Sequence, residues 1–124
     1  MSSWTAAELD RIGRAVEFEV ASRRPDGSLR PFVTIWGVRL GDDIYVRSAH
    51  GADNPWFVRA IASGDGQLRA GGVERDVAFE LVQSGPDEGL RRAYHAKYDR
   101  YGPGPVGSVL TVEAERTTLR LVPR

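Results

Sequence analysis

Short alternating segments separated by glycine-containing turns are the feature that most restricts the fold of this chain. Residues 16–20 read VEFEV and place three apolar side chains on one face, which is typical of a half-buried strand. An Arg-Pro-Asp-Gly turn follows at residues 24–27, because proline presets the turn and glycine accepts a positive φ. The next strand is expected over residues 31–40, where apolar side chains on both faces predict burial.

Further strands are expected after this first pair. A turn at residues 41–43 closes a hairpin to a strand over 44–48. The glycine pair at 71–72 indicates a bend or bulge between two more strands. Residues 103–107 read as a loop. The remaining expected strands cover residues 67–70, 73–82, 108–114 and 117–122, the last two either separate or joined as one bent strand.

Three short helices are expected between these strands. Thr5 and Glu8 form a capping box, which predicts a helix over residues 6–14. A second helix is expected over 55–63, and a third begins near the acidic residues at 87–88 and ends near Tyr101, after a break at Gly85–Pro86. Six or seven strands in hairpin-like succession with three short helices predict a mainly β fold, an antiparallel barrel with helices at its ends.

Composition restricts the possible functions. The 124 residues favour one domain over 1–124, with 17 basic and 17 acidic side chains and a formal net charge of zero. Nucleic-acid-binding domains usually carry a basic excess, so we expect no nucleic-acid partner. The absence of cysteine excludes disulfides and thiolate chemistry, and the two histidines show no metal-ligand spacing. No apolar run approaches the roughly 20 residues of a membrane span, so a cytoplasmic protein without a membrane partner is expected.

The segment 44–59 (IYVRSAHGADNPWFVR) combines a strand end with a helix start. Arg47 and Ser48 end the strand, and Asn54 is the expected N-cap of the following helix. A guanidinium and a hydroxyl that face free backbone N–H groups favour an anion, most often phosphate. The alternative is an ordinary strand-to-helix connection with surface arginines.

Two further residues of this segment could serve the same anion site. Arg59 lies one turn inside the helix and could add a second guanidinium. His50 lies in the connecting loop and could add charge or act as an acid or base.

Aromatic residues suggest a neighbouring ring site. Thr34 and Trp36 share one face of the strand over 31–40 and could flank a planar ring. Trp56 begins the second helix and covers either a pocket or the core. Tyr94 and Tyr98 form a stripe on the third helix that suits a lid or a subunit interface. For all of these aromatic residues, plain core packing is the alternative.

The order of these motifs resembles the FMN-binding split β-barrel superfamily, which includes pyridoxamine-phosphate-oxidase-like and deazaflavin-dependent nitroreductase-like proteins. The resemblance rests on IYVRS, HG and NPWFVRA, together with the R-x-D-G turn, V-T-I-W, R-A-G-G, V-x-F-E and A-Y-x-x-K-Y, and it points to an uncharacterised bacterial family. It implies a six-stranded antiparallel split β-barrel and a homodimer with a cofactor groove at the subunit interface. It also implies FMN or the deazaflavin coenzyme as cofactor.

The resemblance also assigns roles to residues. The cofactor phosphate would contact Arg47, Ser48, Arg59 and His50, and the ring would lie along 33–36 near Thr34 and Trp36. The leading hypothesis is therefore a flavin- or deazaflavin-binding oxidoreductase that acts on an unknown small molecule, with His50 as a proton donor and Tyr94 and Tyr98 closing the substrate side. The alternatives are a cofactor-free small-molecule-binding protein and a cofactor-independent enzyme that uses the same groove.

Overall fold

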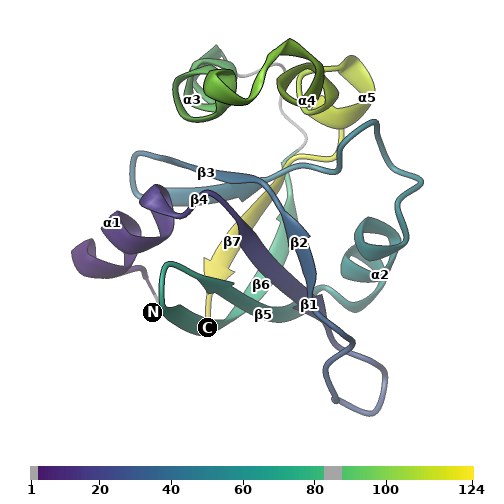
Figure 1. Cartoon of the computed structure of the whole chain (residues 1–124). Coiled ribbons are helices and arrows are strands. Elements are labelled where there is room, and N and C mark those ends of the chain that lie inside the picture. Colours follow the sequence, from purple (N-terminus) through teal and green to yellow (C-terminus); the bar gives the residue numbers. More distant parts are fainter. Residues whose placement is uncertain (1–2, 83–87) are drawn as a thin grey trace.

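The fold is a single antiparallel sheet that curls into a nearly closed barrel with short helices around it (Figure 1). The computed structural model describes residues 3–82 and 88–124. The strand order is β2-β1-β5-β6-β7-β4-β3, and every neighbouring pair is antiparallel. The predicted mainly β barrel is therefore confirmed. The strands are β1 (Phe18–Ser22), β2 (Val33–Ile35), β3 (Gly37–Leu40), β4 (Asp43–Val46), β5 (Asp65–Ala70), β6 (Val73–Leu81) and β7 (Leu119–Pro123).

Seven strands replace the six expected because the segment 31–40 is broken at Trp36. Its two parts, β2 and β3, form the two ends of the strand order, with Trp36 alone between them. The chain therefore crosses from one edge of the sheet to the other at this point. Gly37 follows the break, and a Cβ there would lie 2.2 Å from Cε2 of Phe18. Glycine is thus required where the start of β3 lies against the Phe18 ring of β1.

The helices lie on three sides of the barrel (Figure 1). α1 packs beside β3 and β4, α2 beside β1, and α3 over β3, with the later helices next to α3. They are α1 (Ala6–Arg14), α2 (Pro55–Ser63), α3 (Glu88–Tyr98), the 3-10 helix η1 (Asp99–Tyr101), α4 (Pro103–Ser108) and α5 (Val112–Glu115).

The helices α1 and α2 confirm the sequence prediction at both ends. The capping box between Thr5 and Glu8 is present in α1, and Gly64 ends α2 with a φ of 77°. The third helix and η1 extend to Tyr101 as expected. The predicted break at Gly85–Pro86 and the helix start at Asp87 lie outside the described residues.

The prediction of a loop and a strand over residues 103–114 is wrong, because α4 and α5 occupy this segment. Val106 and Val109 are buried against the tyrosines of α3, and their spacing of three residues is helical. Thr111 caps α5 by accepting a hydrogen bond from the Ala114 N–H at 3.0 Å. The prolines and glycines of residues 103–107 predicted a loop, and the β-branched residues at 109, 111 and 112 predicted a strand, so neither helix was expected.

Two smaller expectations are also corrected. Val16 was expected on the buried face of the first strand, but β1 begins only at Phe18 and Val16 is 41% exposed. Gly71 and Gly72 have φ values of 58° and 82° and form a two-residue hairpin turn between β5 and β6, not a bulge.

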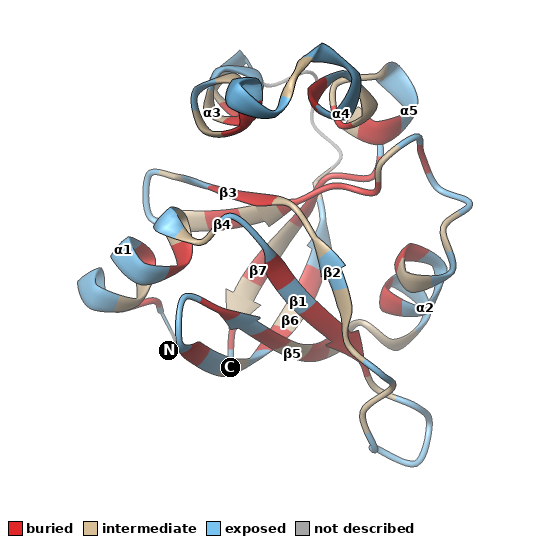
Figure 2. Ribbon diagram, in the orientation of Figure 1, coloured by how far each residue is buried: buried red, intermediate tan, exposed pale blue. Residues whose placement is uncertain are grey.

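Buried side chains form two clusters, one inside the barrel and one under α3 (Figure 2). The barrel cluster includes Phe18, Leu68 and Leu119. The second cluster packs Tyr94 and Tyr98 of α3 against β3 and α4. This second layer holds the helical segment 88–109 against the side of the barrel. Among the described residues, no helix is long and apolar enough to cross a bilayer.

Two consecutive residues of α3 form hydrogen bonds with Gly37, where the chain passes from β2 to β3. The Tyr98 hydroxyl lies 2.6 Å from the Val16 carbonyl oxygen and 2.8 Å from that of Gly37, and it accepts from the Gly37 N–H at 3.1 Å. Lys97, the only lysine of the chain, donates to the Gly37 carbonyl at 2.8 Å, and its Nζ lies 4.8 Å from the Phe18 ring centroid. These contacts hold α3 against Gly37, where the chain passes from one edge strand of the sheet to the other.

Burial of the Lys97 ammonium lowers the pKa of this group from 10.5 to about 8. Between these pH values the unfolded chain holds a proton that the native protein releases, so this group makes the native state relatively more stable as pH rises from about 8 to about 10.5. Lys97→Met removes that dependence. Urea unfolding of both proteins across this interval should show wild type gaining stability relative to the variant, whereas parallel curves would contradict the assignment.

Candidate functional site

A cavity of about 310 Å³ lies between β2, the loop after β4, the start of α2, and α4. Its volume falls within the range of small-molecule sites. It brings together four of the predicted site residues, since Thr34, Trp36, Arg47 and Trp56 all line it. The full lining is Thr34, Ile35, Trp36, Arg47, Ala49, Asn54, Trp56, Pro105, Ser108 and Val109.

Two indole side chains line the cavity in defined positions. The Trp36 ring stacks on Tyr98 with centroids 4.0 Å apart and an interplanar angle of 10°. The Trp56 ring meets Phe57 edge to face, with centroids 6.0 Å apart. These contacts restrict the two half-buried rings, so they offer a preformed apolar surface to a planar ligand.

Arg47 brings a buried positive charge to the same cavity. The residue is 3% exposed, its Nε donates to Thr118 Oγ1 at 2.9 Å, and its Nη1 donates to the Val109 carbonyl at 3.1 Å. Its Cζ lies 5.3 Å from the Tyr94 ring centroid. No carboxylate of residues 3–82 or 88–124 lies within 4.0 Å of the guanidinium. A buried cation without an ionic partner favours an anionic or electron-rich ligand beside it.

Ser48 organises the loop and does not line the cavity. The residue is fully buried, and its hydroxyl donates to the Gly51 carbonyl and accepts from Asn54 Nδ2, the latter at 2.7 Å. The Asn54 amide also donates to the Ala49 carbonyl at 2.8 Å. Asn54 is the N-cap residue of α2, as predicted, although its side chain makes no capping hydrogen bond. Its amide closes the loop instead.

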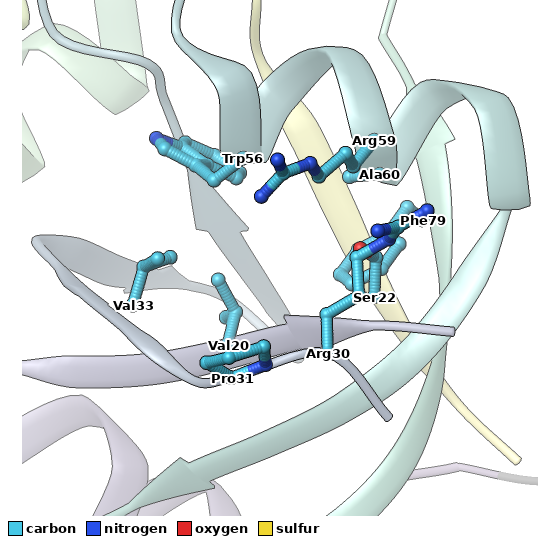
Figure 3. A pocket seen from close by; sticks show the side chains of 9 residues that line it. All are labelled: Val20, Ser22, Arg30, Pro31, Val33, Trp56, Arg59, Ala60 and Phe79. Atoms are coloured by element: carbon cyan, nitrogen blue, oxygen red, sulfur yellow. The ribbon is translucent and has the colours of Figure 1, made fainter. Parts of the chain in front are cut away.

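Two arginines line a second, smaller space beside Trp56 (Figure 3). Arg59 extends from α2, and Arg30 extends from the segment before β2, into a small space between the helix and the sheet. The Nε of Arg30 is buried and has no hydrogen-bond partner among the described residues. Trp56 lines both this space and the larger cavity, whereas Arg47 lines only the latter. Arg59 and Arg47, predicted to act together, therefore lie in different spaces.

Arg30 was not identified by sequence reasoning. A usable signal was its position, since it stands next to Pro31 at the entry to the strand that was expected to carry the ring site. Proline fixes the backbone there and restricts the residue before it, so the direction of the Arg30 side chain is constrained.

The three residues predicted to be catalytic do not line the cavity. His50 is exposed in the loop, has a φ of 66°, and donates its backbone N–H to the Ser108 carbonyl at 2.9 Å. Tyr94 and Tyr98 are fully buried under α3. Burial raises the pKa of the Tyr94 phenol, although the Arg47 charge opposes the shift, and burial also raises that of Tyr98. Such neutral phenols inside a core do not suit a lid over the cavity.

Comparison with solved structures shows the same fold in proteins of low sequence identity. A conserved hypothetical protein from Mycobacterium tuberculosis matches with a TM-score of 0.65 and 18% identity, covering 98% of this chain and 81% of that one. A putative pyridoxamine 5′-phosphate oxidase from Listeria innocua matches with a TM-score of 0.61 and 13% identity, covering 94% and 90%. An F420 reductase matches with a TM-score of 0.53 and 18% identity, covering 93% and 90%.

Sequence comparison gives a family rather than a single relative. A search of curated proteins found no match. A family model described as an uncharacterized protein conserved in bacteria (DUF2255) matches residues 8–121, which is most of the chain. The solved structures show the expected fold, and the family model gives the expected uncharacterised bacterial family. The chain therefore belongs to the bacterial DUF2255 family, whose fold here is a split β-barrel.

Proposed function

We propose that this protein binds a flavin-type cofactor, FMN or the deazaflavin coenzyme, and serves as an oxidoreductase for a small molecule. The observation that supports this most strongly is the position of Trp56 between two different spaces. On one side lies a cavity lined by two indoles, and on the other lie two arginines with a buried, unpartnered Nε. We propose that a flat ring occupies the cavity and that its phosphate reaches past Trp56 to the two arginines, whose space of about 20 Å³ must widen to admit it.

The residues present fit such a group. Trp36 and Trp56 offer apolar surfaces to a ring, and Thr34 offers a hydroxyl at the edge of the same cavity. Arg30 and Arg59 suit phosphate, because guanidinium groups bind its oxygens with two parallel hydrogen bonds. Arg47 places a positive charge in the cavity wall, where it would stabilise negative charge on a bound ring.

The lining of the cavity distinguishes the competing functions. Of its ten lining residues, Arg47 alone carries an ionisable side chain, and arginine stays protonated in proteins. No carboxylate, histidine, lysine or tyrosine among the described residues lines the cavity to act as an acid or base. The reaction therefore needs chemistry from a bound group, and a flavin-type cofactor supplies hydride transfer when it is bound. This disfavours the cofactor-independent enzyme and leaves a cofactor-free binding protein as the alternative.

Similar proteins support the same class of ligand. The Listeria match is named a putative pyridoxamine 5′-phosphate oxidase, and another match is named an F420 reductase. Homodimer formation and a cytoplasmic location stay predictions. The exposed apolar pair Val58 and Ile61 on the outer face of α2 is consistent with an interface next to Trp56.

Titration of the purified protein with riboflavin, FMN and the deazaflavin coenzyme tests the proposal. We expect quenching of ligand fluorescence at equimolar protein, with FMN bound about ten to a hundred times more tightly than riboflavin because of its phosphate. A protein that binds none of the three would contradict the proposal and leave the cofactor-free alternative.

A further inference from the structure

An arginine-rich pocket continues outward from Arg30 and Arg59. It has a volume of about 480 Å³ and lies between the turn after β1 and the outer face of α2. Arg30 and Arg59 line both this pocket and the small space beside Trp56, so the two lie next to each other. The complete lining is Arg23, Arg24, Pro25, Arg30, Val58, Arg59, Ala62, Ser63 and Asp65.

Among the described residues, three of the four guanidinium groups in this pocket form no salt bridge, although Arg24 interacts electrostatically with Asp26, two residues away. Arg23 is paired with Asp76 at 2.8 Å, and the pocket's one carboxylate, on Asp65, is paired with Arg124 at 3.0 Å. For Arg24, Arg30 and Arg59, no carboxylate of residues 3–82 or 88–124 lies within 4.0 Å. The pocket therefore carries an excess of positive charge in a protein whose net charge is zero.

Arg24 is held at the outer rim and not inside the small space. Its Nη1 donates to the Leu29 carbonyl at 2.9 Å, which fixes it across the turn of residues 24–27. Arg30 and Arg59 line the inner end, next to Trp56. The arginines thus follow the pocket from Trp56 outward to Arg24. Neighbouring like charges repel unless an anion lies between them.

We infer that this pocket binds an anionic tail with more than one charged group, in which further phosphate or carboxylate groups extend beyond the group held by Arg30 and Arg59. The identity of the whole ligand rests on the proposed function. The positive charge of the pocket does not depend on that proposal. Of the two cofactors considered, the deazaflavin coenzyme has a phosphodiester followed by carboxylates, whereas FMN ends in one phosphate. The pocket favours the former.

Inorganic anions test the pocket without any ring. Isothermal titration calorimetry with orthophosphate and tripolyphosphate is expected to show about tenfold tighter binding of tripolyphosphate. Arg24→Gln should remove this preference and leave orthophosphate binding unchanged, because Arg24 lies at the rim. The matched control is Arg100→Gln, an exposed arginine of η1, which should behave as wild type. Equal binding of the two anions, or a preference that survives Arg24→Gln, would overturn the inference.

Whole ligands separate this inference from the proposed function. Arg24→Gln should weaken the deazaflavin coenzyme about tenfold and leave FMN and riboflavin unchanged. If FMN and riboflavin bind but the coenzyme is unaffected by Arg24→Gln, the inference fails and the proposed function stands. If no ring compound binds, the proposed function fails, and the inorganic anions alone decide for or against the anionic pocket.

Discussion

The double variant Arg30→Gln/Arg59→Gln is expected to bind FMN about a hundredfold more weakly than wild type and riboflavin equally well. Each guanidinium contributes charge-assisted hydrogen bonds to the phosphate, and loss of one such contact typically costs about tenfold in affinity. Riboflavin has the same ring but no phosphate, so it reports on the indole-lined cavity alone. The difference between the two ligands isolates the contribution of the arginines.

The fold should tolerate this double substitution. Arg59 is exposed, and the buried Nε of Arg30 has no partner among the described residues to lose. Arg91→Gln/Arg92→Gln, on the exposed surface of α3, removes the same charge elsewhere and serves as the matched control. Fluorescence titrations in which FMN and riboflavin weaken together would show that the arginines support the cavity rather than hold phosphate.

Gly37→Ala is expected to reduce the free energy of unfolding by about 3 kcal/mol, the upper end of the usual cost of overpacking. The new Cβ would lie 2.2 Å from Cε2 of Phe18, and Phe18 is fully buried in the barrel cluster. Either the ring or the strand must move, and movement of the strand would disturb the hydrogen bonds of Gly37 with Tyr98 and Lys97. Denaturant unfolding measures the loss.

Gly107→Ala provides the matched comparison. Gly107 lies in α4, precedes no proline, and a Cβ there would meet no atom within 4 Å. Alanine at such a helical site changes stability by less than about 1 kcal/mol, usually in the favourable direction. Equal effects of the two substitutions on stability would contradict the close contact between Gly37 and the Phe18 ring.

The sequence predicted those parts of the fold that depend on local chemistry. The capping box of α1 and the Asn54–Pro55 start of α2 gave helix bounds that the structure confirms. The break at Trp36 had no local signal, because it results from closure of the sheet: each half of the segment 31–40 pairs with a different strand. The helix α4 was missed for a similar reason, since Val106 packs against α3 in the folded protein.

The site was predictable where side chains follow strand direction and not where the outcome depends on packing. Alternation placed Thr34 and Trp36 on one face of the expected strand, and both line the cavity, although Ile35 of the opposite face lines it too. The burial of Ser48 depends on hydrogen bonds with Gly51 and Asn54 that spacing cannot reveal. Arg30 is positioned by the three-dimensional approach of the β2 entry to α2, two segments far apart in the sequence.

The most direct test of the central claim is the NMR spectrum of the three tryptophan indole N–H groups during titration with riboflavin. A ring in the cavity should shift the Trp36 and Trp56 signals, because both indoles line it. Trp4 is 8% exposed, donates its Nε1–H to the Leu121 carbonyl at 3.2 Å, and should not shift. Saturable shifts confined to Trp36 and Trp56 are the predicted result. Unchanged signals for both, at riboflavin concentrations that saturate FMN-type sites, would contradict the account.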